Sequence, residues 1–201
     1  MSTSRNRPIA ILSVFAVALS VLWIGPTVAS AGLCGEFRWS IKSLADVDRR
    51  NIDFQARRTR LARLYGLKPP ETVVEETPRI SPQELRTYSV TARLVKGQIE
   101  GDSDVKFVVS VPGHPNQTMA VEFLADRCME RRFHRRQMLR ARSRALDLCG
   151  PLSHDFTRLR GRVRLVGVGF WGSRSHDEIG GAPNAFQLIP VLRIRGTCRQ
   201  A

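Results

Sequence analysis

The sequence predicts a mainly β fold with one long helix, an α+β domain in which three strands are followed by the helix and then by two more strands. After Tyr88 apolar residues recur at every second position, as in strands, whereas between Ala125 and Leu148 they recur at helical spacing. Turn-forming residues separate the segments. We expect a short helical segment in front of this domain.

The first 31 residues have the organisation of an export signal. Arg5 and Arg7 precede the uncharged run Ile9–Ile24, and residues 29–31 are small at the positions that signal peptidase reads. We predict cleavage after Ala31 and a secreted or periplasmic location at the cell envelope. An uncleaved membrane anchor is the alternative, although a run of 16 residues is short for a bilayer core that needs about 20.

Residues 32–82 form the segment between the signal and the β domain. Apolar residues between Ser40 and Leu64 follow helical spacing only roughly, which predicts one or two short helices. Residues 68–82 contain four prolines and three glutamates. We expect an irregular linker there, because proline lacks a backbone donor. The β domain then comprises residues 83–201.

Three predicted strands open the β domain. The first starts at Tyr88, the second is Val105–Val111 and the third is Thr118–Leu124. Turn residues separate them at 101–104 and 112–116. Such short connections predict a meander of neighbouring strands.

The helix follows the third strand and ends at Gly150 and Pro151, because glycine closes a helix and proline cannot continue it. Arg162–Trp171 and Asn184–Arg195 are the fourth and fifth strands, joined by a polar, glycine-rich connection. This is the element order of the oligonucleotide/oligosaccharide-binding (OB) barrel, a closed sheet of five strands. We therefore predict an OB-like five-stranded barrel, with a plain α+β sheet as the alternative.

Four cysteines follow the export signal: Cys34, Cys128, Cys149 and Cys198. An oxidising compartment predicts two disulfides among them. A straight helix from Cys128 to Cys149 would separate the two by about 30 Å, which no disulfide spans. Either they pair elsewhere, or the helix begins near Arg136 and the preceding residues run back along it. We prefer the second arrangement, which pairs Cys128 with Cys149 and Cys34 with Cys198.

The chain is strongly basic, with 28 arginines, four lysines and a formal net charge of +14. Loss of Arg5 and Arg7 would leave +12. Codon bias in a GC-rich genome is one explanation, and an anion-binding surface is the other. In the last strands, arginines at every second residue share one face of the sheet. These candidate anion-binding residues are Arg158, Arg160, Arg162, Arg164, Arg193 and Arg195.

The function that the sequence favours is a basic OB-like module that binds an anionic polymer, either nucleic acid or acidic polysaccharide, without a cofactor. The first alternative is a divalent-metal-dependent phosphodiesterase, because the Glu100–Asp104 turn is similar to the calcium-binding turn of thermonuclease. Its metal ligands would be Asp102, Asp104, Glu122 and His176. A solvated hairpin turn explains the same residues, and we predict no catalytic residue. The second alternative is a structural or partner-binding envelope protein.

Several short motifs span nearly the whole mature chain. The N-terminal match, W-x-x-K-x-L-x-D, falls on Trp39, Lys42, Leu44 and Asp46, and a Y-x-V-x-A-x-L strand falls on Tyr88, Val90, Ala92 and Leu94. A D-x-D turn and a T-M-I-x-E strand fall on Asp102, Asp104, Thr118, Met119 and Glu122. The longest match is G-V-G-F-F followed by H-G-Q-x-G-x-A-P-N-x-x-E-L-H-P-V, which falls on Gly167–Trp171, His176, Gly180, Ala182–Asn184 and Gln187–Val191.

In these motifs nearly the whole mature chain resembles a family of exported bacterial proteins. This resemblance implies export and a small β-rich fold, and it implies no activity. The chain departs from the family where a site of histidines and carboxylates would lie. The family's glutamate and second histidine are Gln187 and Ile189 here, and the aspartate that commonly follows Phe-Phe is Gly172. A Tyr-His pair after the D-x-D turn is replaced by Val105 and Lys106.

Overall fold

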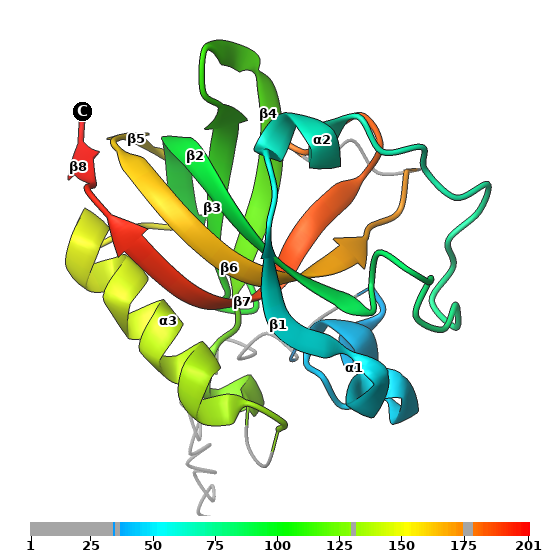
Figure 1. Cartoon of the computed structure of the whole chain (residues 1–201). Coiled ribbons are helices and arrows are strands. Elements are labelled where there is room, and N and C mark those ends of the chain that lie inside the picture. The colour runs from blue at the N-terminus through cyan, green and yellow to red at the C-terminus, as the bar shows by residue number, and fades with distance from the viewer. Residues whose placement is uncertain (1–33, 35–36, 130–131, 175–178) are drawn as a thin grey trace, which may run out of the picture.

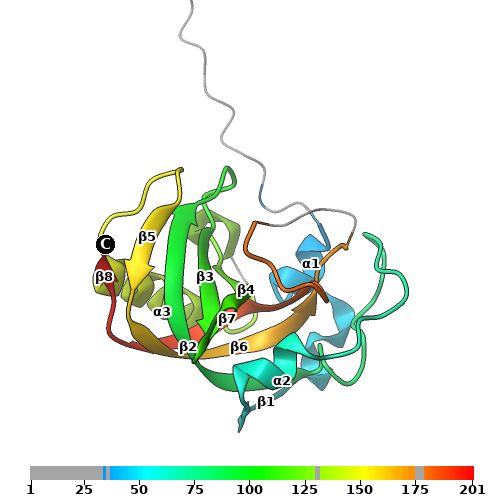
Figure 2. The same ribbon diagram turned by 90° about the horizontal axis from the view of Figure 1, so that it is seen from above.

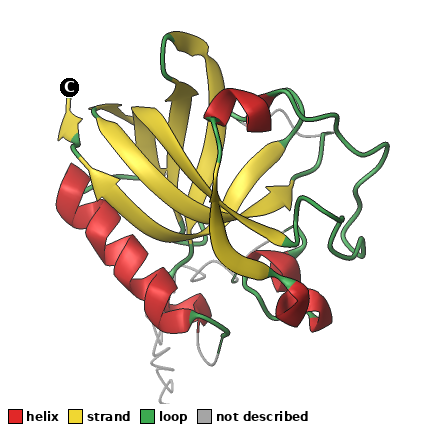
Figure 3. Ribbon diagram, in the orientation of Figure 1, coloured by secondary structure: helices red, strands yellow, loops and turns green. Residues whose placement is uncertain are grey.

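The computed structural model describes residues 34, 37–129, 132–174 and 179–201. In this part of the chain eight strands form one sheet, and a long helix lies along it (Figures 1 and 3). The protein is therefore mainly β with few helices, as predicted. The predicted export signal, residues 1–31, and His176 fall outside the described residues.

The order of the long elements confirms the prediction of three strands, a helix and two strands. These elements are β2 (Arg86–Ile99), β3 (Val105–Val111), β4 (His114–Phe123), α3 (Arg135–Cys149), β6 (Arg162–Trp171) and β7 (Phe186–Gly196). β2 is longer than predicted because it serves two neighbours: residues 87–93 pair with β6, and residues 93–99 pair with β3.

The prediction of a closed five-stranded barrel is wrong. Three further strands join the sheet of the described residues: β1 (Asp53–Arg58) and β5 (Thr157–Arg160) pair with β2, and β8 (Arg199–Gln200) pairs with β5. No continuous ladder joins β4 to β7, which pair at one position, Val121 opposite Leu188. Most side chains of β1 and β8 are exposed, so these two strands lack the apolar alternation that predicts a strand. β5 carries Arg158 and Arg160, the backward continuation of the arginine spacing of Arg162 and Arg164.

The segment in front of the β domain contains the short helices that were predicted. They are α1 (Trp39–Lys42) and α2 (Leu61–Tyr65), with the 3-10 helix η1 (Val47–Asn51) between them. Strand β1 lies in the same segment and pairs in parallel with β2, so these residues also extend the sheet. Residues 68–82 contain neither helix nor strand, as their prolines predict.

Buried apolar side chains form two clusters. The larger lies between the long strands and contains Trp171 and Phe186. The smaller joins α1 and α3 to β6 and β7, through residues such as Ile41, Met138 and Phe170. The aromatic residues nearest to the predicted arginine stripe are thus core residues.

The four cysteines form two disulfides, as predicted, but the predicted pairing is wrong. Cys34 is joined to Cys128 and Cys149 to Cys198. Helix α3 begins at Arg135, close to the expected start, yet Cys128 precedes it in the 3-10 helix η2 (Asp126–Met129) instead of running back along it.

The length of α3 explains this pairing. Fifteen residues span about 22 Å, which keeps the two ends of the helix apart. At the far end the C-terminal strand β8 returns to the helix (Figure 2). There Gln200 Nε2 donates to the carbonyl of Cys149 at 3.0 Å. The C-terminus is therefore the segment that brings a cysteine to Cys149.

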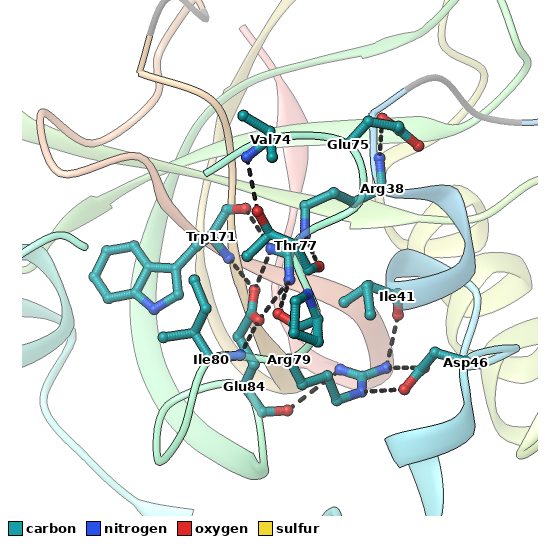
Figure 4. A network of polar contacts seen from close by, with 11 residues as sticks. Arg38, Ile41, Asp46, Val74, Glu75, Thr77, Arg79, Ile80, Glu84 and Trp171 are labelled. Carbon is teal, nitrogen blue, oxygen red and sulfur yellow. Dashed lines mark hydrogen bonds and ion pairs between the residues drawn. The ribbon is translucent and has the colours of Figure 1, made fainter. Parts of the chain in front are cut away.

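A buried ion pair attaches the N-terminal segment to the sheet (Figure 4). The Arg38 guanidinium and the Glu84 carboxylate make two hydrogen bonds, of 2.7 and 2.8 Å, and both side chains are fully buried. Arg38 also donates to the carbonyls of Thr77, Pro78 and Trp171, while Glu84 accepts from the backbone N–H of Trp171. Arg38 thus joins the N-terminal segment to the end of β6 and to residues 68–82, which we call the proline-rich segment.

A second buried arginine reinforces the same region. Arg79 binds both carboxylate oxygens of Asp46, at 3.0 and 2.7 Å, and donates to the carbonyls of Ile41 and Glu84. The two arginines therefore hold α1 and η1 against the start of β2.

No helix among the described residues is long and apolar enough to cross a membrane.

Glu84→Gln should destabilise the fold by about 3–5 kcal/mol, because it leaves the Arg38 charge buried without its counter-charge. Chemical denaturation of the purified protein measures this loss. Asp53→Asn is the control, since it removes an exposed ion pair with Arg57 worth at most about 1 kcal/mol. Equal, small losses in both variants would contradict a structural role for the buried pair.

Candidate functional site

The six predicted anion-binding arginines are all exposed. They alternate with buried residues such as Leu159, Val163 and Ile194, because successive strand residues point to opposite faces of the sheet. The period-2 spacing in the sequence is therefore a true cationic stripe on the solvent side of β5, β6 and β7.

Strand pairing places arginine opposite arginine across this surface. Arg164 lies opposite Arg195, Arg162 opposite Arg93, and Arg160 opposite Arg199. Like charges directly opposite each other destabilise a sheet. Repulsion between these arginine pairs therefore destabilises the fold locally, and a bound anion would reduce that repulsion.

Two surface depressions extend the stripe. A depression of about 520 Å³, which we call the terminal depression, is lined by Arg93, Arg160, Arg162 and Arg199. A second of about 510 Å³, which we call the helix groove, lies between α3 and β7 and is lined by Arg140, Arg144, Arg193 and Arg195. Figure 1 shows α3 lying along β7, the arrangement that forms this groove.

The arginines of the stripe and of the two depressions together form what we call the arginine face. Its members are Arg93, Arg140, Arg144, Arg158, Arg160, Arg162, Arg164, Arg193, Arg195 and Arg199. Within the described residues none of these side chains makes an ion pair, and the one hydrogen bond is from Arg140 Nε to the carbonyl of Arg136. The guanidinium groups are thus available to an external anion.

Sequence reasoning missed four members of this face. Arg140 and Arg144 are four residues apart on α3, a spacing that places them on one side of a helix. Arg93 and Arg199 could not be found in this way, because only the strand pairing brings them beside Arg162 and Arg160.

The carboxylates proposed as metal ligands lie in a different place, and one of them, Glu122, is paired with lysines. Lys42 Nζ binds Glu122 Oε2 at 3.0 Å, and Lys106 Nζ binds Glu100 Oε1 at 3.2 Å. Asp104 is buried and accepts a hydrogen bond from the backbone N–H of Ala125. These five side chains form the lysine–carboxylate cluster, which comes from α1, the turn between β2 and β3, β3 and β4.

Burial and mutual repulsion shift the protonation of this cluster. Burial, with the charges of Asp102 and Glu122, raises the pKa of Asp104 to about 8. Burial and the charge of Glu122 raise the pKa of Glu100 to about 7, despite the nearby lysines. Burial lowers the pKa of Lys42, but its ion pair with Glu122 outweighs burial and leaves that pKa above its ordinary value. One carboxyl of the cluster is therefore protonated near neutral pH.

This arrangement does not support the predicted divalent-metal site. The structure brings Asp104 and Glu122 together, and the nearby charge of Asp102 also contributes to the raised pKa of Asp104. Among the described residues, however, no three His, Cys, Asp or Glu side chains are placed to hold a metal ion. His176 is not among these residues. Lys42 and Lys106 take the coordination positions that a cation would need on Glu122.

The polar connection before β7 has a structural role at Asn184. This buried side chain donates from Nδ2 to the carbonyls of Leu64, Tyr65 and Leu67 at the end of α2, and its Oδ1 accepts from Phe186 N–H. Gln187 is buried as well. The asparagine of the sequence pattern therefore caps a helix that precedes it by more than a hundred residues.

No family model, curated protein or solved structure matches this chain. The resemblance to exported bacterial proteins stays a prediction, and the function has to be argued from the arginine face and the lysine–carboxylate cluster alone.

The free energy of unfolding should fall as the pH rises from about 4 to about 8 and then level off. The pKa of Asp104 is raised from 3.8 to about 8 in the folded state, so the folded protein binds more protons than the unfolded chain between these values. Asp104→Asn should weaken this dependence and leave the part due to Glu100, whose pKa is raised to about 7. Denaturation series at several pH values measure it.

Asp147→Asn is the matched control, because it removes an exposed carboxylate outside the lysine–carboxylate cluster. An unaltered slope in Asp104→Asn would show that Asp104 is ionised in the folded protein.

Proposed function

We propose that this protein is an exported, basic binding module with OB-like connectivity, whose arginine face binds an anionic polymer. The observation that carries the proposal is the set of ten exposed arginines without ion-pair partners in the described residues. No observation favours catalysis over binding, because Glu122 and Glu100 are held in ion pairs with lysines.

The OB-like part of the proposal concerns five of the eight strands. β2 pairs with β3, β3 with β4, β4 with β7, β7 with β6 and β6 with β2, and the β4–β7 contact is parallel. Helix α3 stands between β4 and β6 in the sequence. This connectivity supports an OB-like unit, to which β1, β5 and β8 are additions.

The chemistry of arginine supports an oxyanion ligand. A guanidinium group donates two parallel hydrogen bonds to a phosphate or carboxylate, and its charge persists at any physiological pH. Arg164 and Arg195 are direct cross-strand neighbours, so one anionic group can contact both. An extended polymer would place successive anionic groups along the helix groove and the terminal depression.

The disulfides support the exported part of the proposal. Two disulfides are typical of proteins from an oxidising compartment, such as the periplasm or the extracellular space. The N-terminal sequence adds the predicted export signal.

The double variant Arg164→Gln/Arg195→Gln should bind a fluorescent ten-residue thymidine oligonucleotide less tightly and with a weaker salt dependence. Loss of two phosphate contacts should lower the slope of log K against log salt by about 1.4, at roughly 0.7 per contact on a single strand. Fluorescence anisotropy at several salt concentrations measures both quantities, and retention on immobilised heparin provides a second readout.

Arg50→Gln/Arg63→Gln is the matched control, since it removes the same charge from exposed arginines outside both depressions. Equal losses in the two double variants would mean that net charge alone acts. If the wild-type protein bound neither probe at low salt, the proposal would fail in favour of a structural or partner-binding envelope protein.

A further inference from the structure

A third depression, which we call the Phe54 depression, continues the helix groove away from the C-terminus. Its volume is about 260 Å³, and Phe54, Ala56, Thr87 and Val166 line it. Gln137, Leu192 and Arg193 line both hollows, so the two are contiguous. It is smaller than the roughly 300–1,000 Å³ pockets that hold drug-sized ligands, and its size suits one ring system.

Thr87, one of the residues that line the Phe54 depression, carries a buried polar atom without a partner in the described residues. Thr87 is 1% exposed, and its Oγ1 makes no hydrogen bond within the described residues. An unsatisfied buried hydroxyl costs about 1–3 kcal/mol in a folded protein. A ligand with a ring donor or acceptor would satisfy it.

Phe54, which lines the depression, packs against two further rings that lie behind it and do not line the depression. The Phe54 ring lies 5.6 Å from Phe133 and 4.0 Å from His134, measured between ring centroids. Phe133 is 42% exposed, which is unusual for a large apolar side chain in this protein. His134 is held by Gln137, whose Oε1 lies 2.6 Å from His134 Nδ1. The patch thus offers ring faces beside the arginines.

We infer that the anionic polymer is a single-stranded nucleic acid, and that the Phe54 depression seats one of its bases. This inference rests on the proposed function. A base would pack against Phe54 and Leu192 and hydrogen-bond Thr87 Oγ1, while the adjoining phosphates would contact Arg193 and the helix groove. Flat, sequence-tolerant stacking on aromatic side chains beside a cationic groove is the way that proteins hold single strands.

An acidic polysaccharide shares the charge but not the planar, hydrogen-bonding ring. The arginines alone would accept either polymer, whereas the Phe54 depression distinguishes between them. Heparin therefore serves as the probe for charge, and the bases of an oligonucleotide serve as the probe for the depression.

The decisive comparison is between a ten-residue thymidine oligonucleotide and an abasic deoxyribose-phosphate chain of the same length and charge. The account predicts that the purified protein binds the thymidine strand about tenfold or more tightly than the abasic chain at the same salt concentration. Equal affinities would overturn the base seat and leave the proposed polyanion binding intact. Absence of binding to both chains and to heparin would overturn the proposed function itself.

Thr87→Val tests the same inference at one atom. The variant keeps the shape and removes a hydroxyl that has no partner in the described residues, so the folded state should be as stable as the wild type or more stable. We expect the affinity for the thymidine strand to fall about fivefold, the equivalent of one hydrogen bond, with heparin retention unchanged. Unchanged oligonucleotide affinity in this correctly folded variant would contradict a base bound at Thr87.

Phe133→Ala tests the aromatic patch. It should weaken thymidine-strand binding about tenfold, because stacking on an aromatic ring contributes that much for a single base. Val74→Ala is the control, because Val74 is similarly exposed and lies in the proline-rich segment outside the three depressions. Equal effects of the two variants on oligonucleotide affinity would contradict a role for Phe133.

Discussion

The buried ion pair between Arg38 and Glu84 is the interaction on which this structure depends. A bidentate pair without solvent access survives only when hydrogen bonds satisfy its remaining donors and acceptors, and here three carbonyls and two backbone N–H groups do so. Both side chains also bind the backbone of Trp171, the last residue of β6. The pair therefore fixes the end of the strand whose first half carries Arg162 and Arg164.

Ion pairs inside the protein also explain why the surface arginines lack acidic partners. Glu84, Asp46 and Glu122 are each bound to a basic residue of the N-terminal segment or of the segment before β2. These carboxylates are therefore unable to pair with the arginines of β5, β6, β7 and α3. The ten arginines of the arginine face therefore have no ion-pair partner in the described residues, and the anion-binding proposal follows from that separation of buried pairs and exposed arginines.

Local pattern was enough to predict the long elements and the exposed arginines, because both depend on the period of neighbouring residues. It could not predict what non-local pairing decides: the strands β1 and β8, the disulfide partners, or the meeting of Arg93 with Arg162. The carboxylates of the predicted metal site do converge in part, yet the lysine that neutralises Glu122 comes from α1, eighty residues earlier. The unsatisfied hydroxyl of Thr87 could not be predicted for the same reason, because it depends on which non-local side chains surround it.

The central claim is that the arginine face, and not basic charge in general, binds the polymer. Arginine side-chain Nε–Hε signals, followed by NMR during titration with a ten-residue thymidine oligonucleotide, test it most directly. The account predicts that the signals of the arginine face shift, with those of the helix groove moving most, while the signals of Arg38, Arg79 and the exposed Arg50 and Arg63 stay in place. Shifts of similar size at all exposed arginines, or shifts confined to residues outside the face, would contradict it.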